Sequence, residues 1–144
     1  MNERITVKIK LEPGSFLPTR AHDNDAGWDL YAREDFTVPA GGSAVHDTGV
    51  HMQIPEGCCG LLVSKSGLNV KHSILSTGLV DAGYSGSYLV KLYNHDRGKD
   101  YQFHAGDKIS QVTVLRLADI EGLEVVAELD DSERGSGGFG STGK

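Results

Sequence analysis

Alternating apolar and polar residues along the chain predict β-strands. In ITVKIKL (5–11), Ile, Val, Ile and Leu occupy every second position and threonine or lysine the others, which is the two-residue period of a half-buried strand. The same alternation occurs at 50–54 and in QVTVLRL (111–117), and YLVKLY (88–93) is rich in residues that favour strands. We therefore expect an all-β chain.

Short turn sequences separate these segments. Proline or glycine marks a reversal at residues 13–14, 39–42, 55–57 and 105–107. Such closely spaced strands and turns favour a jelly-roll β-sandwich or barrel. Two segments differ. SKSGLNVKHS (64–73) fits one helical turn, whereas LADIEGLEVVAEL (117–129) has a weak helical period but also Gly122 and two valines, so we expect a strand there.

The apolar pattern ends after Asp131. We therefore expect one β domain over residues 1–130 and a flexible, glycine-rich tail over 131–144. A chain of 144 residues has the usual size of a single domain. Nineteen glycines against four prolines agree with a chain of many turns and little rigid linker.

Charge and composition exclude several classes of protein. The net charge is −6, and no basic run is interleaved with aromatic residues, so we expect no nucleic-acid partner. No stretch approaches the ~20 apolar residues of a membrane helix, and MNERITVKIK (1–10) lacks the apolar centre of a signal peptide. We expect no membrane contact and a cytoplasmic location. The adjacent Cys58 and Cys59 and the six histidines lack the spacing of a disulfide or zinc site.

The tail RGSGGFGSTGK (134–144) contains five glycines and one large apolar side chain, Phe139. Residues 138–144 match the glycine and lysine spacing of a nucleotide-binding P-loop. That loop leads from a strand into a helix, and the sequence stops at Lys144, so we expect no such site.

The same tail can still bind a nucleotide in another way. Glycine amides with the hydroxyls of Ser141 and Thr142 can hold phosphate oxygens, Arg134 supplies charge, and Phe139 can cover a planar base. A tail without a function is the alternative.

Four internal segments share a pattern of polar residues set among turns. They are AGWDLYA (26–32), LLVSKSGL (61–68), GLVDAGYSG (78–86) and QFHAGDKISQVTV (102–114). Together with the tail they have the order and approximate spacing of the five motifs of trimeric dUTP diphosphatases (dUTPases), which the chain resembles from about residue 20 to its end. The resemblance implies a β jelly roll, a homotrimer with active sites at subunit interfaces, Mg²⁺, and hydrolysis of dUTP to dUMP and pyrophosphate. That reaction limits uracil in DNA and supplies dUMP for dTMP synthesis.

The resemblance also implies roles for single residues. Asp81 would orient and activate the attacking water, as a carboxylate beside the α-phosphorus can. Asp29 would hold Mg²⁺ through water; the alternative is a buried aspartate that caps a turn. Tyr84 would pack beneath the sugar, and the hairpin 78–88 would read the uracil edge. The full set of expected substrate contacts is Lys65, Ser66, Gly67, Gly78, Val80, Tyr84, Gln111, Arg134, Phe139, Gly140, Ser141 and Thr142.

The tail would act as a lid. Ordering its eleven residues costs on the order of 10–20 kcal/mol, so we expect closure only over bound substrate, on a neighbouring subunit. For Gln111 a solvent-facing strand residue remains the alternative.

The sequence also departs from the family pattern. Lys65 stands where arginine is usual and loses the two-pronged contact with phosphate. Leu75 stands where many relatives have asparagine, so uracil recognition must depend on backbone or other groups. Ser85 and Ser87 replace arginine and glutamate, a change that the sequence does not explain.

Two other functions fit parts of the sequence. A dCTP deaminase shares the fold and a similar third motif but needs a glutamate ten residues after Asp81, where Lys91 stands. A non-catalytic protein that senses dUTP would use the same pocket without hydrolysis. Lys91 and the FGSTG ending disfavour the deaminase, and the retained Asp29, Asp81 and Arg134 disfavour the loss of catalysis.

Overall fold

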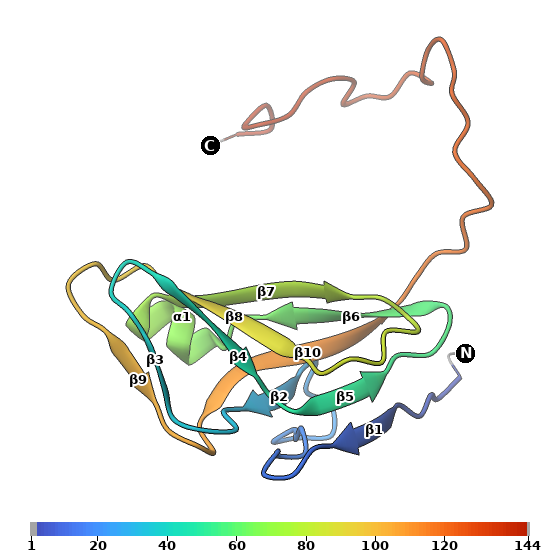
Figure 1. Ribbon diagram of the computed structural model, residues 1–144. Helices are drawn as coiled ribbons and strands as arrows, with labels where there is room; N and C mark the ends of the chain where they lie inside the picture. The colour runs from blue at the N-terminus through green and yellow to red at the C-terminus, as the bar shows by residue number, and fades with distance from the viewer. Residues whose placement is uncertain (1–2, 144) are drawn as a thin grey trace.

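A computed structural model describes residues 3–143 and shows a curled β fold with one short helix in that part of the chain (Figure 1). The elements are β1 (Lys8–Leu11), β2 (Trp28–Tyr31), β3 (Phe36–Val38), β4 (Ser43–Asp47), β5 (Val50–Gln53), β6 (Cys58–Val63), α1 (Ser66–His72), β7 (Ile74–Val80), β8 (Leu89–Asn94), β9 (Tyr101–Phe103) and β10 (Lys108–Arg116). Residues 1, 2 and 144 lie outside the described residues. The first two begin the expected β domain 1–130, and residue 144 ends both the expected tail and the P-loop match.

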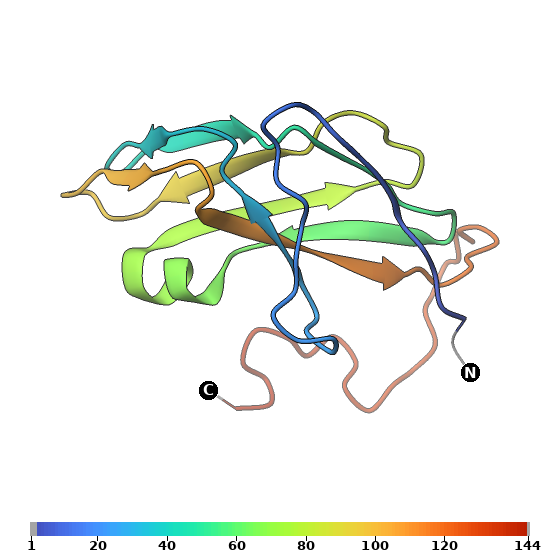
Figure 2. The same cartoon turned by 90° about the horizontal axis from the view of Figure 1, so that it is seen from below.

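The strands form one large antiparallel sheet and two small ones. The six-stranded sheet has the order β2-β10-β6-β7-β8-β4, and the pairs β1-β5 and β3-β9 complete the fold. In Figure 1, β1 and β5 lie beneath β6 and β7. Figure 2, seen from below, shows β2 crossing in front of the long strands. The all-β jelly roll expected from the sequence is confirmed.

Alternating side chains of the strands build the core between these layers. In β8, Val90, Leu92 and Asn94 are buried while the intervening residues face outward. Val50 and Met52 in β5 repeat this pattern, as the sequence predicted. Tyr88 and Phe103 are the largest fully buried side chains.

The first expected strand is shorter and more exposed than its pattern predicted. Only residues 8–11 form β1, and Ile5, Ile9 and Leu11 remain 36–42% exposed. The reason is that β1 pairs with β5 alone, at an edge that the described chain does not cover. The helical turn expected at 64–73 is confirmed as α1, which Ser73 ends in a left-handed conformation, φ 56°.

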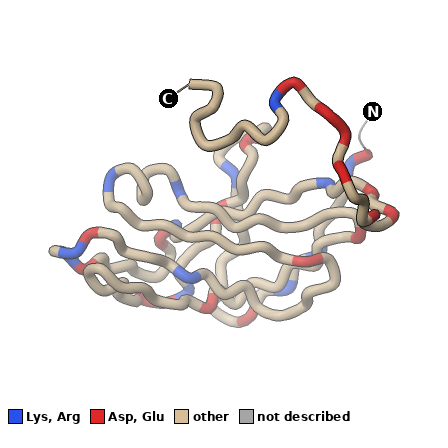
Figure 3. The backbone as a smooth tube through the Cα atoms, turned by 90° about the horizontal axis from the view of Figure 1, so that it is seen from above, with Lys and Arg blue, Asp and Glu red and all other residues tan. Residues whose placement is uncertain are grey.

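The strand expected at 117–129 is wrong. The described chain forms neither strand nor helix there, because no strand edge pairs with the segment. Leu117 N donates to Gly57 O, after which the chain leaves the body, and Leu123 and Val125 are 94% and 98% exposed. Figure 1 shows the tail arching away, and Figure 3 shows acidic residues along it. The boundary near residue 130 stays a prediction.

None of the helices in the described residues has the length and apolar character needed to cross a membrane.

Candidate active site

A cavity opens where β7 and β8 separate. The two strands pair only at residues 74–76 and 92–94, after which β7 continues beside β6 alone. The loop 81–88 bridges the gap, and the cavity between the strands has a volume of about 270 Å³. It is lined by Leu62, Thr77, Gly78, Leu79, Val80, Asp81, Tyr84, Ser87, Tyr88, Leu89 and Lys91. The fold thus gathers four of the expected site residues: Gly78, Val80, Asp81 and Tyr84.

The loop 81–88 holds Asp81 at the mouth of this cavity. Tyr84 N donates to Asp81 O at 3.3 Å, and Gly83 between them has φ +87°, which favours glycine. The Tyr84 hydroxyl donates to Ser87 O at 2.9 Å. A Cβ at Gly86 would collide with the Tyr84 ring, so glycine lets that ring lie against the loop. Asp81 itself is exposed.

A second group of expected residues surrounds Asp29. This carboxylate is buried, with 6% of its surface exposed. One oxygen accepts a hydrogen bond from Lys65, and the other lies 3.2 Å from Lys108 Nζ. Asp29 therefore pairs with two lysines and does not cap a turn. Its hydrogen bond and negative charge raise the pKa of Lys108.

Lys108 was not predicted from the sequence. The register of β10 against β2 shifts between Lys108 and Ser110, and this irregularity accompanies the contact of Lys108 with Asp29. A run that alternates as regularly as KISQVTV gives no sign of such a shift. The sequence did offer one sign of this contact: Lys108 is a cation in the same predicted strand as Gln111, three residues before it.

Gln111 lies between Asp29 of β2 and Val63 of β6 in the sheet. Its amide Nε2 donates to Ser64 O at 3.0 Å, and any side chain at Gly27 would collide with it. The side chain is half-buried and held against the backbone of Ser64. Gln111 thereby fixes the start of the segment that carries Lys65, Ser66 and Gly67.

The two groups lie at opposite ends of the β6–β7 pair. Ser64 exchanges two hydrogen bonds with Ser76, whose backbone is five residues from Asp81. At the strand rise of about 3.3 Å per residue, the two ends are about 16 Å apart. One chain therefore does not assemble the full set of expected contacts.

The tail contacts neither group. Its interactions are local: Arg134 Nε donates to Gly137 O at 2.6 Å, and Ser141 N donates to Gly138 O. Phe139 is fully exposed, and Gly140 and Thr142 are exposed beside it. The expected tail contacts are thus not made within the described chain.

The residues near Asp29 suit only one kind of magnesium site. Within residues 3–143 no three His, Cys, Asp or Glu side chains are grouped so as to hold a metal. Asp29 offers hard carboxylate oxygens beside two lysines. This fits a Mg²⁺ ion that keeps its waters and takes its other ligands from substrate phosphates, and it does not fit a protein cage.

Comparison with known proteins identifies the family. Residues 15–143 match the family model described as dUTPase. The chain belongs to the dUTPase family. Relatives named deoxyuridine 5'-triphosphate nucleotidohydrolase include a Candida glabrata protein, 39% identical over 97% of this chain and 96% of the relative. A Mycobacterium leprae family member is 43% identical over 94% of this chain and 92% of its own.

Solved dUTPase structures share the fold. A mutant dUTPase of Staphylococcus bacteriophage 80alpha, solved with dUpNHpp, has a TM-score of 0.89 at 31% identity and covers 96% of this chain and 99% of its own. A mutant dUTPase from phage phi11 of S. aureus, described with a structural Mg(II) ion, has a TM-score of 0.78 at 29% identity over 86% and 98%. The family and fold expected from the sequence are confirmed.

Proposed function

We propose that this chain hydrolyses dUTP to dUMP and pyrophosphate, with Asp81 activating the attacking water. The observation that carries this proposal is the cavity between β7 and β8, with Asp81 exposed at its mouth and Tyr84 on its wall, in a chain of the dUTPase family. The product dUMP then serves dTMP synthesis, and the loss of dUTP limits uracil in DNA.

The cavity suits a base and a deoxyribose. Beyond Ser76, the backbone groups of β7 on the side of β8 have lost their partner strand, so Gly78 and Val80 can read the edge of a uracil ring. Leu62 and Tyr88 supply apolar walls. Leu75 does not line the cavity, which supports recognition of the base through the backbone.

Asp81 is suited to act as the general base. An exposed carboxylate can take a proton from a water molecule aligned with the α-phosphorus. General-base catalysis of this kind raises the rate about 10²–10⁴-fold. Its turn, closed by the Tyr84 amide at 3.3 Å, holds the carboxylate on the sugar side of the cavity. Tyr84 packs beneath the sugar, where a 2′-hydroxyl would find no room.

The Asp29 end of the sheet is suited to hold the phosphates. Lys65, Ser66 and Gly67 would contact phosphate oxygens, and Gln111 would support them from β10. Two lysines against one carboxylate leave a net positive charge there, which attracts a polyphosphate. Magnesium bound to the triphosphate supplies charge neutralisation and alignment, and Asp29 would contact its waters.

The separation of the two groups supports a site shared between chains. Asp81 and Lys65 lie at opposite ends of β6 and β7, about 16 Å or more apart. A homotrimer brings one chain's loop 81–88 to another chain's Asp29 end. The segment 117–129 also exposes apolar side chains, among them Leu123 and Val125, that the described residues of its own chain do not bury. Packing against a neighbouring chain would bury them.

The tail would close the site. Arg134, Gly140, Ser141 and Thr142 would hold the phosphates of a substrate bound on a neighbouring chain, while Phe139 covers its base. A fully exposed phenylalanine among glycines is free to do this. The exposed state of the tail agrees with a lid that closes only on substrate.

The two alternatives gain no support. Lys91 lines the cavity at the position where a deaminase of this fold needs glutamate, and lysine does not replace a carboxylate base. A sensor that has lost catalysis would not need the catalytic aspartate, yet the loop retains both Asp81 and Tyr84 at the cavity.

The test is pyrophosphate release from dUTP, dTTP, dCTP and UTP, with and without Mg²⁺. We expect release from dUTP alone, strongly dependent on Mg²⁺. Asp81→Asn should fold and bind dUTP yet lose nearly all release. Release of ammonia from dCTP would favour the deaminase, and near-normal turnover of Asp81→Asn would remove Asp81 from the mechanism.

A further inference from the structure

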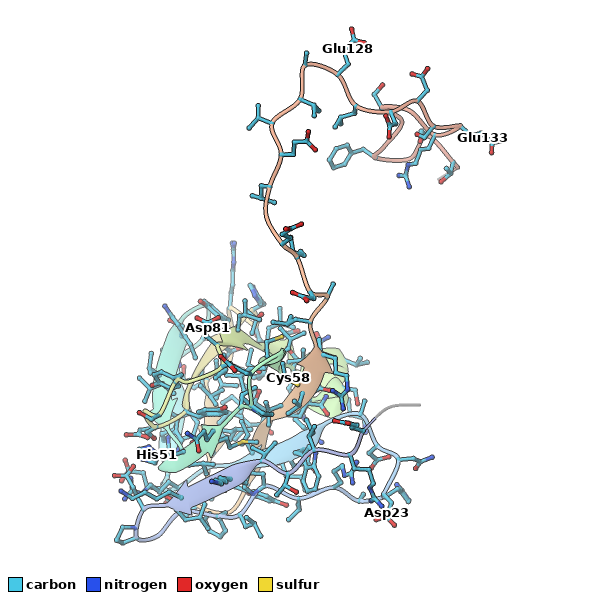
Figure 4. The ribbon with its side chains drawn as sticks, turned by 90° about the vertical axis from the view of Figure 1, so that its right-hand side faces the viewer. Asp23, His51, Cys58, Asp81, Glu128 and Glu133 are labelled. Carbon is cyan, nitrogen blue, oxygen red and sulfur yellow. The ribbon has the colours of Figure 1, made fainter. Side chains whose placement is uncertain are left out.

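The loop 81–88 is fastened to the neighbouring strands β4 and β5 by two ionisable side chains. Asp47, at the end of β4, accepts hydrogen bonds from the Ser87 hydroxyl and from Gly49 N. His51, in the middle of β5, places Nδ1 2.8 Å from the backbone oxygen of Ser85. Figure 4 shows His51 and Asp81 on the same side of the domain.

His51 faces an acceptor at each ring nitrogen. Besides Ser85 O at Nδ1, the carboxylate of Glu12 lies 3.2 Å from Nε2. A carbonyl and a carboxylate both accept, so both contacts require N–H groups. A neutral imidazole has only one N–H, whereas the imidazolium has two. An imidazolium at this half-buried position can therefore satisfy both contacts, whereas a neutral ring can satisfy only one.

The charges around His51 come from three neighbouring elements. Glu12, just after β1, also lies 3.8 Å from Arg33, which follows β2. Lys10 of β1 is the Cα partner of His51, and both line a groove with Ser85. Asp47 holds the other flank of the loop. Glu12 is thus the only carboxylate among the described residues in direct contact with the ring.

We propose that His51 is a positioning residue for dUTP binding, whose imidazolium holds the loop 81–88 in place through Ser85 O. The proposal rests on the function proposed above, because the loop carries Tyr84 and Asp81. Both serines that depart from the family pattern take part in these contacts, Ser85 through its backbone oxygen and Ser87 through its hydroxyl. Position 85 needs only its backbone oxygen, and position 87 needs only a hydroxyl for Asp47.

Deprotonation of His51 breaks this arrangement. Histidine is the side chain that changes charge between about pH 5 and 8. When the ring loses a proton, a lone pair faces either Ser85 O or the Glu12 carboxylate, and one of the two contacts becomes repulsive. The loop is then held less firmly, so KM for dUTP rises with pH while kcat changes less.

The experiment compares His51→Gln with the wild type in dUTP hydrolysis between about pH 5.5 and 8.5. Glutamine is uncharged and cannot donate to two acceptors on opposite sides. We expect its KM at about pH 6 to be about fivefold above wild type, the worth of one hydrogen bond, and to vary less with pH. A merely structural loss would lower kcat at every pH and leave the shape of the KM profile unchanged.

Two control variants match this substitution. His104→Gln removes another histidine beside a carboxylate, Asp107, at 3.8 Å on the surface, away from the loop. Ser85→Ala keeps the backbone oxygen that His51 contacts. Both should retain the wild-type KM profile. A His51→Gln profile that coincides with wild type would overturn the proposal.

The failure of this proposal is distinguishable from failure of the proposed function. If wild-type protein releases no pyrophosphate from dUTP, the function fails, and ¹⁵N NMR of the histidine rings then tests His51 by itself. The proposed contact of His51 with Ser85 O is supported if both ring nitrogens carry a proton at about pH 6. It also requires that amides of the loop 81–88 exchange more slowly in the wild type than in Glu12→Gln. A ring with one proton at that pH, or equal exchange, refutes it.

Discussion

Replacing Asp29 with asparagine tests the phosphate and magnesium end of the site. The side chain keeps its shape, but one acceptor oxygen becomes an amide NH₂ group that faces an ammonium. Lys108 is 48% exposed and can turn into water, so we assign its loss no stability cost. Lys65 is 27% exposed and loses a charge-assisted hydrogen bond, worth about 1–2 kcal/mol after allowance for its exposure.

That loss sets the expected size of the effect. For a domain of this length, about 1–2 kcal/mol lowers Tm by roughly 3–8 °C. Under the proposed role of Asp29, in which its carboxylate contacts metal-bound water, the substitution should weaken the apparent Mg²⁺ affinity about 10–100-fold. The assays are thermal melting without nucleotide and pyrophosphate release across a Mg²⁺ titration.

Asp25→Asn provides the matched control. The Asp25 side chain is 40% exposed; its carboxylate lies 3.4 Å from His22 Nδ1 and accepts from His22 N at 3.0 Å, a bond that the asparagine oxygen can keep. The substitution should shift Tm by about 1 °C or less and leave the Mg²⁺ titration unchanged. An unchanged Mg²⁺ titration in Asp29→Asn would show that Asp29 is structural only. An unchanged Tm would refute the ion pair with Lys65.

Two further predictions concern the tail and the core. Removal of residues 134–144 should leave Tm within about 1 °C, since Phe139 is fully exposed, and should reduce activity by about 10²-fold or more; full activity would refute the lid. Burial lowers the pKa of His46 below its ordinary 6.5, and the neutral ring accepts from Arg33 N at 2.8 Å. Its stabilisation is therefore complete above pH 6.5 and lost as pH falls. Tm of the wild type should drop more steeply on acidification than that of His46→Gln, and equal slopes would contradict this.

Much of the fold follows from local pattern. The strand β5 was predictable because it buries every second side chain, which leaves a two-residue period in the sequence. The strand β8 was predictable from its content of residues that favour strands, although its buried and exposed positions also alternate. The hairpin around Asp81 was predictable because its turn depends on glycine, as Gly83 with φ +87° shows. Such features depend on neighbours in the chain.

Other features depend on partners that the sequence does not reveal. Residues 117–129 carry the apolar content of a strand, yet a strand forms only beside an edge, and the described chain offers none to it. Lys108 reaches Asp29 at a shift of register. His51 contacts Glu12 and Ser85, 39 and 34 residues away, so only the folded sheet brings the three together.

A subunit-mixing experiment tests the central claim, that Asp81 of one chain acts in a site closed by another chain's tail. Asp81→Asn chains and chains lacking residues 134–144, each inactive alone, are refolded together in equal amounts. A site that draws Asp81 and the tail from different chains is intact in one combination of four, so we predict about a quarter of wild-type dUTP hydrolysis. A mixture as inactive as its two components would contradict the account.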